Sequence, residues 1–119
     1  MAGRRMLAFL YPNGYTTEVR RAMSTFLRSD VFGAWLSRLT DDMGRARILQ
    51  RIRSAEAGNF GDCARVGEGV SEMRIHIGPG YRIYFTRRGA TIYLLLLGGD
   101  KSSQRRDIKR AIAMARDLE

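Results

Sequence analysis

Four side chains in the second half of the chain could act together on a phosphate ester: Arg74, His76, Arg82 and Lys101. Guanidinium groups stay charged and match phosphate geometry with paired hydrogen bonds, and histidine changes its charge near neutral pH. Such a set suits metal-free cleavage of RNA, in which the 2′-OH attacks the adjacent phosphorus. A base takes the hydroxyl proton, a cation stabilises the phosphorane and an acid protonates the leaving 5′-oxygen.

Two tyrosines accompany these charges. Tyr81 and Tyr84 can stack on bases or donate a phenolic proton. Strand alternation places Arg74 and His76 on one face of a sheet, and it predicts that Arg82 and Tyr84 share a solvent-exposed face in the next strand. The alternative is a merely solvated surface, because charged residues commonly alternate on the open face of an antiparallel sheet.

The composition favours a polyanionic partner. Lysine and arginine outnumber aspartate and glutamate by 21 to 12, which gives a net charge of +9 and a pI near 10.8. Nucleic acid, an anionic membrane and an acidic protein would all fit this surplus. One cysteine, Cys63, and one histidine cannot build a disulfide or a zinc site, so we expect no metal and no small-molecule cofactor.

A length of 119 residues predicts one domain. Residues 1–22 differ from the rest, and we interpret them as an N-terminal extension before a domain at 23–119, with Met23 as a candidate internal start. The alternative is an edge strand at 16–21 that pairs with the body. The start resembles a signal peptide, but its apolar patch ends at the turn Pro12-Asn13-Gly14 and no cleavage site follows. No apolar run is long enough to cross a membrane, and we expect a cytoplasmic protein.

The elements that must position the charges follow from hydrophobic periodicity. A strand at 24–28 precedes a helix capped by Asp30 and a second helix that starts near Asp41 or Asp42 and stops at Gly58. Three antiparallel strands follow at 70–77, 81–87 and 90–97, and Gly98-Gly99-Asp100 should end the sheet. A last helix begins near Ser102 or Ser103. The order predicts an α+β domain, with a helical hairpin and a C-terminal helix packed on a mainly antiparallel sheet.

Several blocks in this order resemble the RelE/ParE superfamily of toxins from type II toxin–antitoxin modules, and within it the HigB-like branch of addiction-module killer proteins. The resemblance runs from about Phe26 to Ala115. The segments that carry it are Ala46-Arg47-Ile48 with Arg51-Ile52, Gly58-Asn59-Phe60-Gly61-Asp62, Gly67–Ile75, Gly78–Phe85, Leu96–Gln104 and Asp107-Ile108.

This resemblance implies a RelE-like fold and a ribosome-dependent mRNA endoribonuclease that inhibits translation. It also implies neutralisation by a cognate helix-turn-helix (HigA-like) antitoxin. It places Arg82 on the scissile phosphate, with Arg74, His76 and Lys101 in the catalytic set. Further RNA contacts are expected at Arg65, Tyr81, Tyr84, Gln104 and Arg105.

One position departs from the branch. A lysine commonly stands two residues after the Gly-Asp of Gly61-Asp62, and here Ala64 stands there, followed by Arg65. Arginine and lysine are not interchangeable where position matters, and strand parity would put Arg65 on the other side. Ala64 and the N-terminal extension keep open the alternative of a degenerate toxin that only binds its antitoxin. The superfamily resemblance leaves a second alternative, a ParE-like DNA gyrase inhibitor without nuclease activity.

Overall fold

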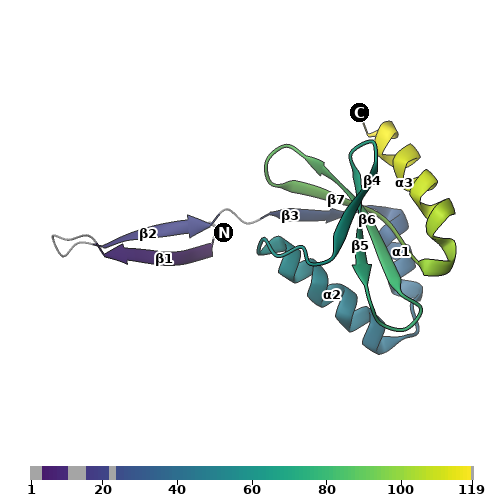
Figure 1. Cartoon of the computed structure of the whole chain (residues 1–119), viewed down its shortest axis with the longest axis horizontal. Helices are drawn as coiled ribbons and strands as arrows, with labels where there is room; N and C mark the ends of the chain where they lie inside the picture. Colours follow the sequence, from purple (N-terminus) through teal and green to yellow (C-terminus); the bar gives the residue numbers. More distant parts are fainter. Residues whose placement is uncertain (1–3, 11–15, 22–23, 119) are drawn as a thin grey trace.

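A five-stranded mixed sheet forms the centre of the computed structural model, which describes residues 4–10, 16–21 and 24–118. The strand order is β3-β7-β6-β5-β4. The strands are β3 (Thr25–Arg28), β4 (Cys63–Gly67), β5 (Val70–Ile75), β6 (Tyr81–Arg88) and β7 (Ile92–Asp100). Strand β3 runs parallel to β7, and the other neighbours are antiparallel (Figure 1).

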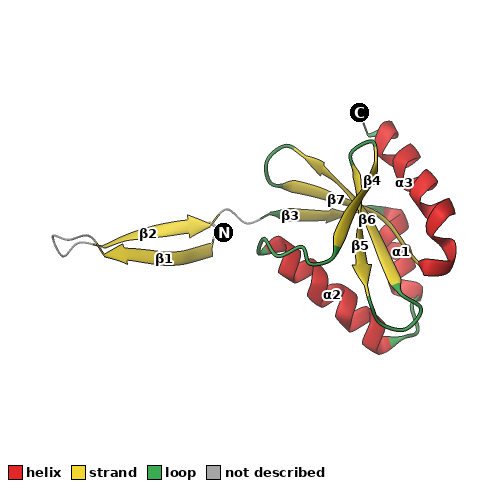
Figure 2. Cartoon of the chain, in the orientation of Figure 1, coloured by secondary structure: helices red, strands yellow, loops and turns green. Residues whose placement is uncertain are grey.

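Helices cover both faces of this sheet. Helices α1 (Asp30–Arg38) and α2 (Asp42–Glu56) lie on one face, and α3 (Gln104–Asp117) lies on the other (Figure 2). The first core contains Phe32, Ile48 and Ile83, and the second contains Tyr84, Leu97 and Ala111. The predicted α+β class is confirmed. The expected open sheet face is wrong, because the alanines and isoleucines of α3 need an apolar surface to cover.

Short polar side chains set the helix starts. Ser29, rather than the predicted Asp30, caps α1 and accepts a hydrogen bond from the Phe32 amide at 3.0 Å. Asp41 caps α2 by accepting from the Gly44 amide at 3.0 Å, and the helix starts where the sequence predicts. At the other end of α2, Gly58 has a φ of 100°, which explains the predicted stop.

Strand β7 continues through Gly98, Gly99 and Asp100, where we expected the sheet to end. A side chain at Gly98 would collide with the ring of Trp35, and one at Gly99 would collide with Asp107. Gly98 therefore lets α1 approach the strand closely, and Gly99 does the same for α3. The 3-10 turn η1 (Lys101–Ser103) then leads into α3, with Asp100 accepting from the Ser102 amide at 2.8 Å.

Strand β4 was not predicted. It is short and lies at the edge of the sheet, paired antiparallel with β5. Its residues Cys63-Ala64-Arg65-Val66-Gly67 show little contrast between alternate positions, because an edge strand buries only part of each face.

Residues 4–21 contain β1 (Arg4–Leu10) and β2 (Thr16–Arg21), which pair antiparallel with each other. A strand does form at 16–21, but its partner is β1 and not the five-stranded sheet. The predicted turn at Pro12-Asn13-Gly14 and the candidate start at Met23 lie outside the described residues. No helix in the described ranges has the length and apolarity needed to span a membrane.

Candidate functional site

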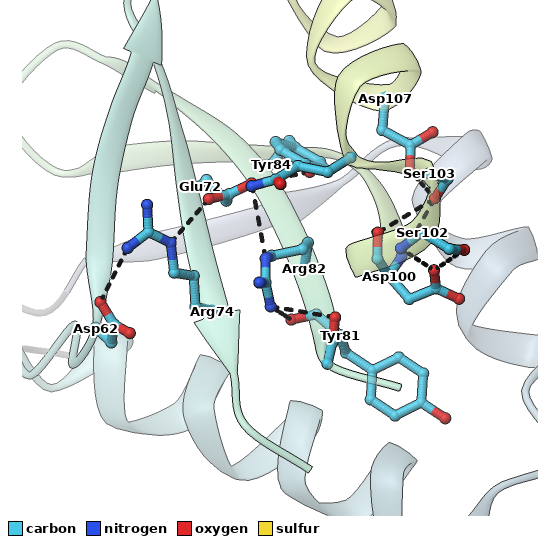
Figure 3. Close-up of polar contacts among 12 residues, drawn as sticks. Asp62, Glu72, Arg74, Tyr81, Arg82, Tyr84, Asp100, Ser102, Ser103 and Asp107 are labelled. Atoms are coloured by element: carbon cyan, nitrogen blue, oxygen red, sulfur yellow. Dashed lines mark hydrogen bonds and ion pairs between the residues drawn. The ribbon is translucent and has the colours of Figure 1, made fainter. Parts of the chain in front are cut away.

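A buried carboxylate, Glu72, organises the polar residues on the α3 side of the sheet. Its side chain is fully buried, and it accepts hydrogen bonds from Arg74 Nε at 2.9 Å, Tyr84 OH at 3.0 Å and Gln104 Nε2 at 2.7 Å. Glu72 lies directly opposite Tyr84 in the β5–β6 register, and Arg74 lies opposite Arg82. Alternation thus places the four strand residues of this set on one sheet face (Figure 3), and Gln104 reaches Glu72 from α3.

These contacts keep Glu72 ionised. Burial alone would raise the pKa of its carboxyl, but the hydrogen bonds from Gln104, Arg74 and Tyr84 outweigh burial and lower it. Burial and the bond to Glu72 raise the pKa of Tyr84, which therefore stays a neutral donor. The carboxylate fixes the positions of its donors and balances the charge of the arginines around it.

Arg82 is almost completely buried, with 7% of its surface exposed, so the expected exposure to solvent is wrong. Its Nη1 donates to the carbonyls of Gly80 at 3.1 Å and Tyr81 at 3.2 Å. Its Nε lies 3.8 Å from Glu72 Oε2, and this buried atom has no hydrogen-bond partner in the described part of the chain. The guanidinium is thus held by two backbone carbonyls at Nη1 and by the charge of the Glu72 carboxylate near Nε.

A cavity of about 360 Å³ opens beside Arg82. It is lined by His76, Ile77, Gly78, Pro79, Gly80, Arg82 and Lys101. Gly80 lies beside both Arg82 and Lys101, since a Cβ there would lie 3.4 Å from Arg82 Nη1 and 3.5 Å from Lys101 Cβ, and its φ of 79° favours glycine. Three of the four predicted catalytic residues therefore share one opening, and Arg74 lies outside its lining.

His76 lies just after the end of β5 and is paired with Asp62. Its Nε2 is 2.6 Å from Asp62 Oδ2, and 68% of its side chain is exposed. The bond from His76 and the nearby charge of Arg74, at 3.8 Å, hold the pKa of Asp62 below its ordinary value. An ionised carboxylate only accepts, so Nε2 is the donor of this bond and Nδ1 is the ring nitrogen that is left to act as an acceptor. The pair has the geometry of an oriented general base.

Sequence reasoning missed both acidic residues of this site. Glu72 carried a signal, because it stands two residues before Arg74 in a strand and must share its face. Asp62 carried none while β4 was unrecognised, because the β4–β5 pairing is what brings it opposite Arg74, whose amide donates to its carbonyl at 2.9 Å.

The predicted RNA-contacting residues do not gather at one place. Tyr84 is buried beneath α3, so the expected stacking surface is absent there. Tyr81 faces the opposite core and donates to Asp41 Oδ2 at 2.8 Å; burial and this bond raise its pKa to about 12. Gln104 donates its side-chain hydrogen bond to Glu72, whereas Arg105 is exposed on α3.

The departure at Ala64 falls on the site itself. Ala64 pairs with Glu72 and therefore shares its face, whereas Arg65 pairs with Ser71 and projects from the opposite face. Arg65 lines a different cavity, together with Phe60 and Phe85. It therefore does not replace a cation at position 64.

Within the described ranges there is no group of three or more His, Cys, Asp or Glu side chains that could hold a metal ion. Cys63 is half-buried, and burial raises the pKa of its thiol, which weakens it as a nucleophile.

No family model matches the chain. The chain is 44% identical over 87 residues to an uncharacterized protein of Haemophilus influenzae, an alignment that covers 73% of this chain and 88% of the relative. The chain therefore belongs to the same protein family as this Haemophilus influenzae protein.

Proposed function

We propose that this protein is the toxin of a type II toxin–antitoxin module, with a RelE-like fold, and that it cleaves mRNA on the ribosome. The observation that carries the proposal is the cavity that brings together His76, Arg82 and Lys101. A phosphate seated there would meet two cations and a histidine whose ring is oriented by Asp62. The net charge of +9 and the resemblance to the HigB-like branch support a nucleic-acid substrate.

Each residue then has a defined task. His76 Nδ1 takes the proton of the 2′-OH as that oxygen attacks phosphorus. Arg82, fixed by Glu72 and two carbonyls, stabilises the charge of the phosphorane. Lys101, which lines the same cavity, donates a proton to the leaving 5′-oxygen. The products are a 2′,3′-cyclic phosphate and a 5′-hydroxyl.

The exposed side of α3 extends this basic surface away from the cavity. An open hollow of about 610 Å³ is lined by Ser102, Ser103, Arg105, Arg106, Lys109 and Arg110. Cations in this row fit the phosphates of an RNA strand or of ribosomal RNA, which carry no base identity. The protein would act in the cytoplasm, where its cognate helix-turn-helix antitoxin would restrain it.

A second candidate is a toxin that has lost cleavage and only binds its antitoxin. The placement of Ala64 favours it, because the position opposite Glu72 then lacks the cation that the branch commonly has there. The two candidates differ in RNA cleavage and not in fold.

Induced expression with mapping of RNA 5′ ends tests the proposal. The chain is expressed alone and with the small gene adjacent to its own. We expect growth arrest with new mRNA ends, relieved by the neighbour. The variants His76→Ala and Lys101→Ala, both at exposed positions, should abolish the new ends. Arg38→Ala, an exposed arginine at the end of α1, is the matched control and should arrest growth normally.

Other outcomes contradict the proposal. Arrest with a DNA-damage response and no new RNA ends would indicate gyrase inhibition. No arrest, with retained binding to the neighbouring gene product, would favour the degenerate toxin. Full activity of the His76→Ala and Lys101→Ala variants would remove the cavity from the mechanism.

A further inference from the structure

A second cavity lies on the other face of the sheet from the Glu72–Arg82 network, in the region of the first core. Its volume is about 560 Å³. It is lined by Phe60, Cys63, Arg65, Gly67, Glu68, Gly69, Val70, Ser71, Phe85, Arg87 and Tyr93. The proposed function uses none of these side chains.

The floor of this cavity is aromatic. Phe60, Phe85 and Tyr93 pack with ring centroids 5.2 to 6.0 Å apart, and Phe26 stacks on Tyr93 at 4.9 Å. Three of these rings line the cavity: Phe60 and Tyr93 are partly exposed and Phe85 is buried, and this apolar surface favours an apolar ligand group.

The rim of the cavity is basic. Arg65 and Arg87 are both exposed, and Arg65 makes no ion pair or hydrogen bond within the described ranges. The lining also contains Glu68, but Arg116 already binds that carboxylate, at 2.8 and 2.5 Å. The free charge at the rim is therefore positive, and it fits a ligand with carboxylates beside its apolar group.

Strand β4 borders the cavity and has a neighbour on one side only within the described sheet. The Arg74 amide donates to the Asp62 carbonyl, which fixes the hydrogen-bonding phase of the β4–β5 pair. Inward and outward backbone groups alternate along such a ladder, so the amides and carbonyls of Cys63 and Arg65 point to the free edge. Their side chains face the cavity.

We propose that this edge and cavity bind an extended acidic peptide of a partner protein. The peptide adds a strand beside β4, its apolar side chain enters the aromatic cavity, and acidic side chains two residues away meet Arg65 and Arg87. A peptide is favoured over RNA because the outward β4 edge presents both donors and acceptors. A peptide backbone supplies partners for both, whereas a phosphate backbone only accepts.

The proposal is tested with a labelled seven-residue peptide, Thr-Glu-Thr-Phe-Thr-Glu-Thr, capped at both ends, and the full chain. Fluorescence anisotropy should show saturable binding that weakens at least tenfold in the double variant Arg65→Ala/Arg87→Ala. The matched control Arg38→Ala/Arg47→Ala removes two exposed arginines elsewhere and should bind as the wild type does. The same peptide with lysine in place of glutamate should not bind.

Backbone methylation tests the added strand. Peptide residues opposite Cys63 and Arg65 share their face and exchange hydrogen bonds with them. Methylating the amides of Glu and Phe in the peptide should therefore abolish binding, and methylating those of Thr should not. Equal binding of both methylated peptides would overturn strand addition.

Three further results would overturn the proposal. They are equal binding of the lysine peptide, an unchanged affinity of the Arg65→Ala/Arg87→Ala variant, and displacement of the peptide by oligouridylate with the same dependence on Arg65. Self-association of the chain that disappears in this double variant would identify a second copy as the occupant instead. None of these measurements depends on RNA cleavage, so the proposed function stands or fails separately.

Discussion

His76 and Asp62 form the pair on which the proposed proton transfer depends. In Asp62→Asn the amide can still hydrogen-bond the ring, but it no longer selects the tautomer with the proton on Nε2. We expect RNA cleavage to slow by about tenfold, since general-base catalysis contributes on the order of a hundredfold or more. Single-turnover cleavage of a ribosome-bound mRNA measures this rate.

Binding of RNA separates this role from a merely electrostatic one. Asp62 is exposed and Asp62→Asn makes the protein more basic, so RNA affinity should stay equal or increase while the rate falls. A variant that loses rate and affinity together, or neither, would contradict the assignment of Asp62 as the residue that orients His76.

Glu72 gives a prediction of pH-dependent stability. Its pKa in the folded protein lies below the ordinary value of 4.5, so the folded state favours the ionised form. The stabilisation is fully present above pH 4.5 and is lost as the pH falls from there through the folded pKa. Glu72→Gln should remove this pH dependence. It should also cost about 3 kcal/mol at neutral pH, because buried arginine charge is left uncompensated.

Urea unfolding at pH 7 and at pH 4 measures both effects. Glu68→Gln is the matched control, because Glu68 is paired with Arg116 at an exposed position, and its unfolding midpoint should stay close to that of the wild type. If Glu72→Gln keeps the full stability and pH dependence of the wild type, Glu72 does not organise the site.

Strand alternation was enough to predict which face of the sheet each site residue lies on, but not whether that face is covered. Alternation correctly grouped Arg74 with Arg82 and separated both from Met73 and Ile83. It could not show that α3 covers their face, so Arg82 and Tyr84 were expected in solvent. That burial depends on where a helix about twenty residues further along the chain packs, which no local pattern determines.

At the scale of elements, β7 shows how a strand and a helix are fitted together. Gly98→Ala would place a methyl group against the Trp35 ring, and we expect a loss of about 2 kcal/mol of unfolding free energy. Gly33→Ala is the matched control. That glycine lies within α1 with no atom close to its missing Cβ, so alanine should stabilise the protein by about 0.5 kcal/mol. Urea unfolding should show opposite signs; equal signs would contradict this packing.

Most elements could be predicted because their signals are local. Helix α2 has a capping aspartate, a periodic apolar face and a glycine stop, and its predicted bounds agree with Asp42–Glu56. Strand β4 and the last residues of β7 could not be predicted, because they depend on contacts outside their own segment. Strand β4 needs β5 as its partner, and the β7 glycines are explained by Trp35 and Asp107.

At the scale of the whole molecule, the described strands β1 and β2 pair with each other, and the five-stranded sheet is complete without them. A chain that starts at Met23 should therefore keep its unfolding free energy within about 1 kcal/mol, the range of ordinary surface changes. Chemical denaturation of both chains measures this. A much larger loss would mean that residues 1–22 are part of the structural core.

The distribution of charge, rather than its total, should decide RNA binding. The triple variant Arg105→Gln/Arg106→Gln/Lys109→Gln and the control Arg38→Gln/Arg47→Gln/Arg53→Gln each remove three exposed cations, which lowers the net charge from +9 to +6 in both. If Arg105, Arg106 and Lys109 on α3 contact phosphates, RNA binding to the first variant releases fewer counterions, whereas binding to the control releases as many as before.

The salt dependence of RNA affinity measures that release. For single-stranded RNA each phosphate contact contributes roughly 0.7 to the slope of log affinity against log salt, so the α3 variant should show a slope shallower by about 2. The control should keep the wild-type slope, because its arginines lie on α1 and α2. Equal slopes in both variants would mean that RNA affinity depends on the net charge alone and that RNA does not contact α3.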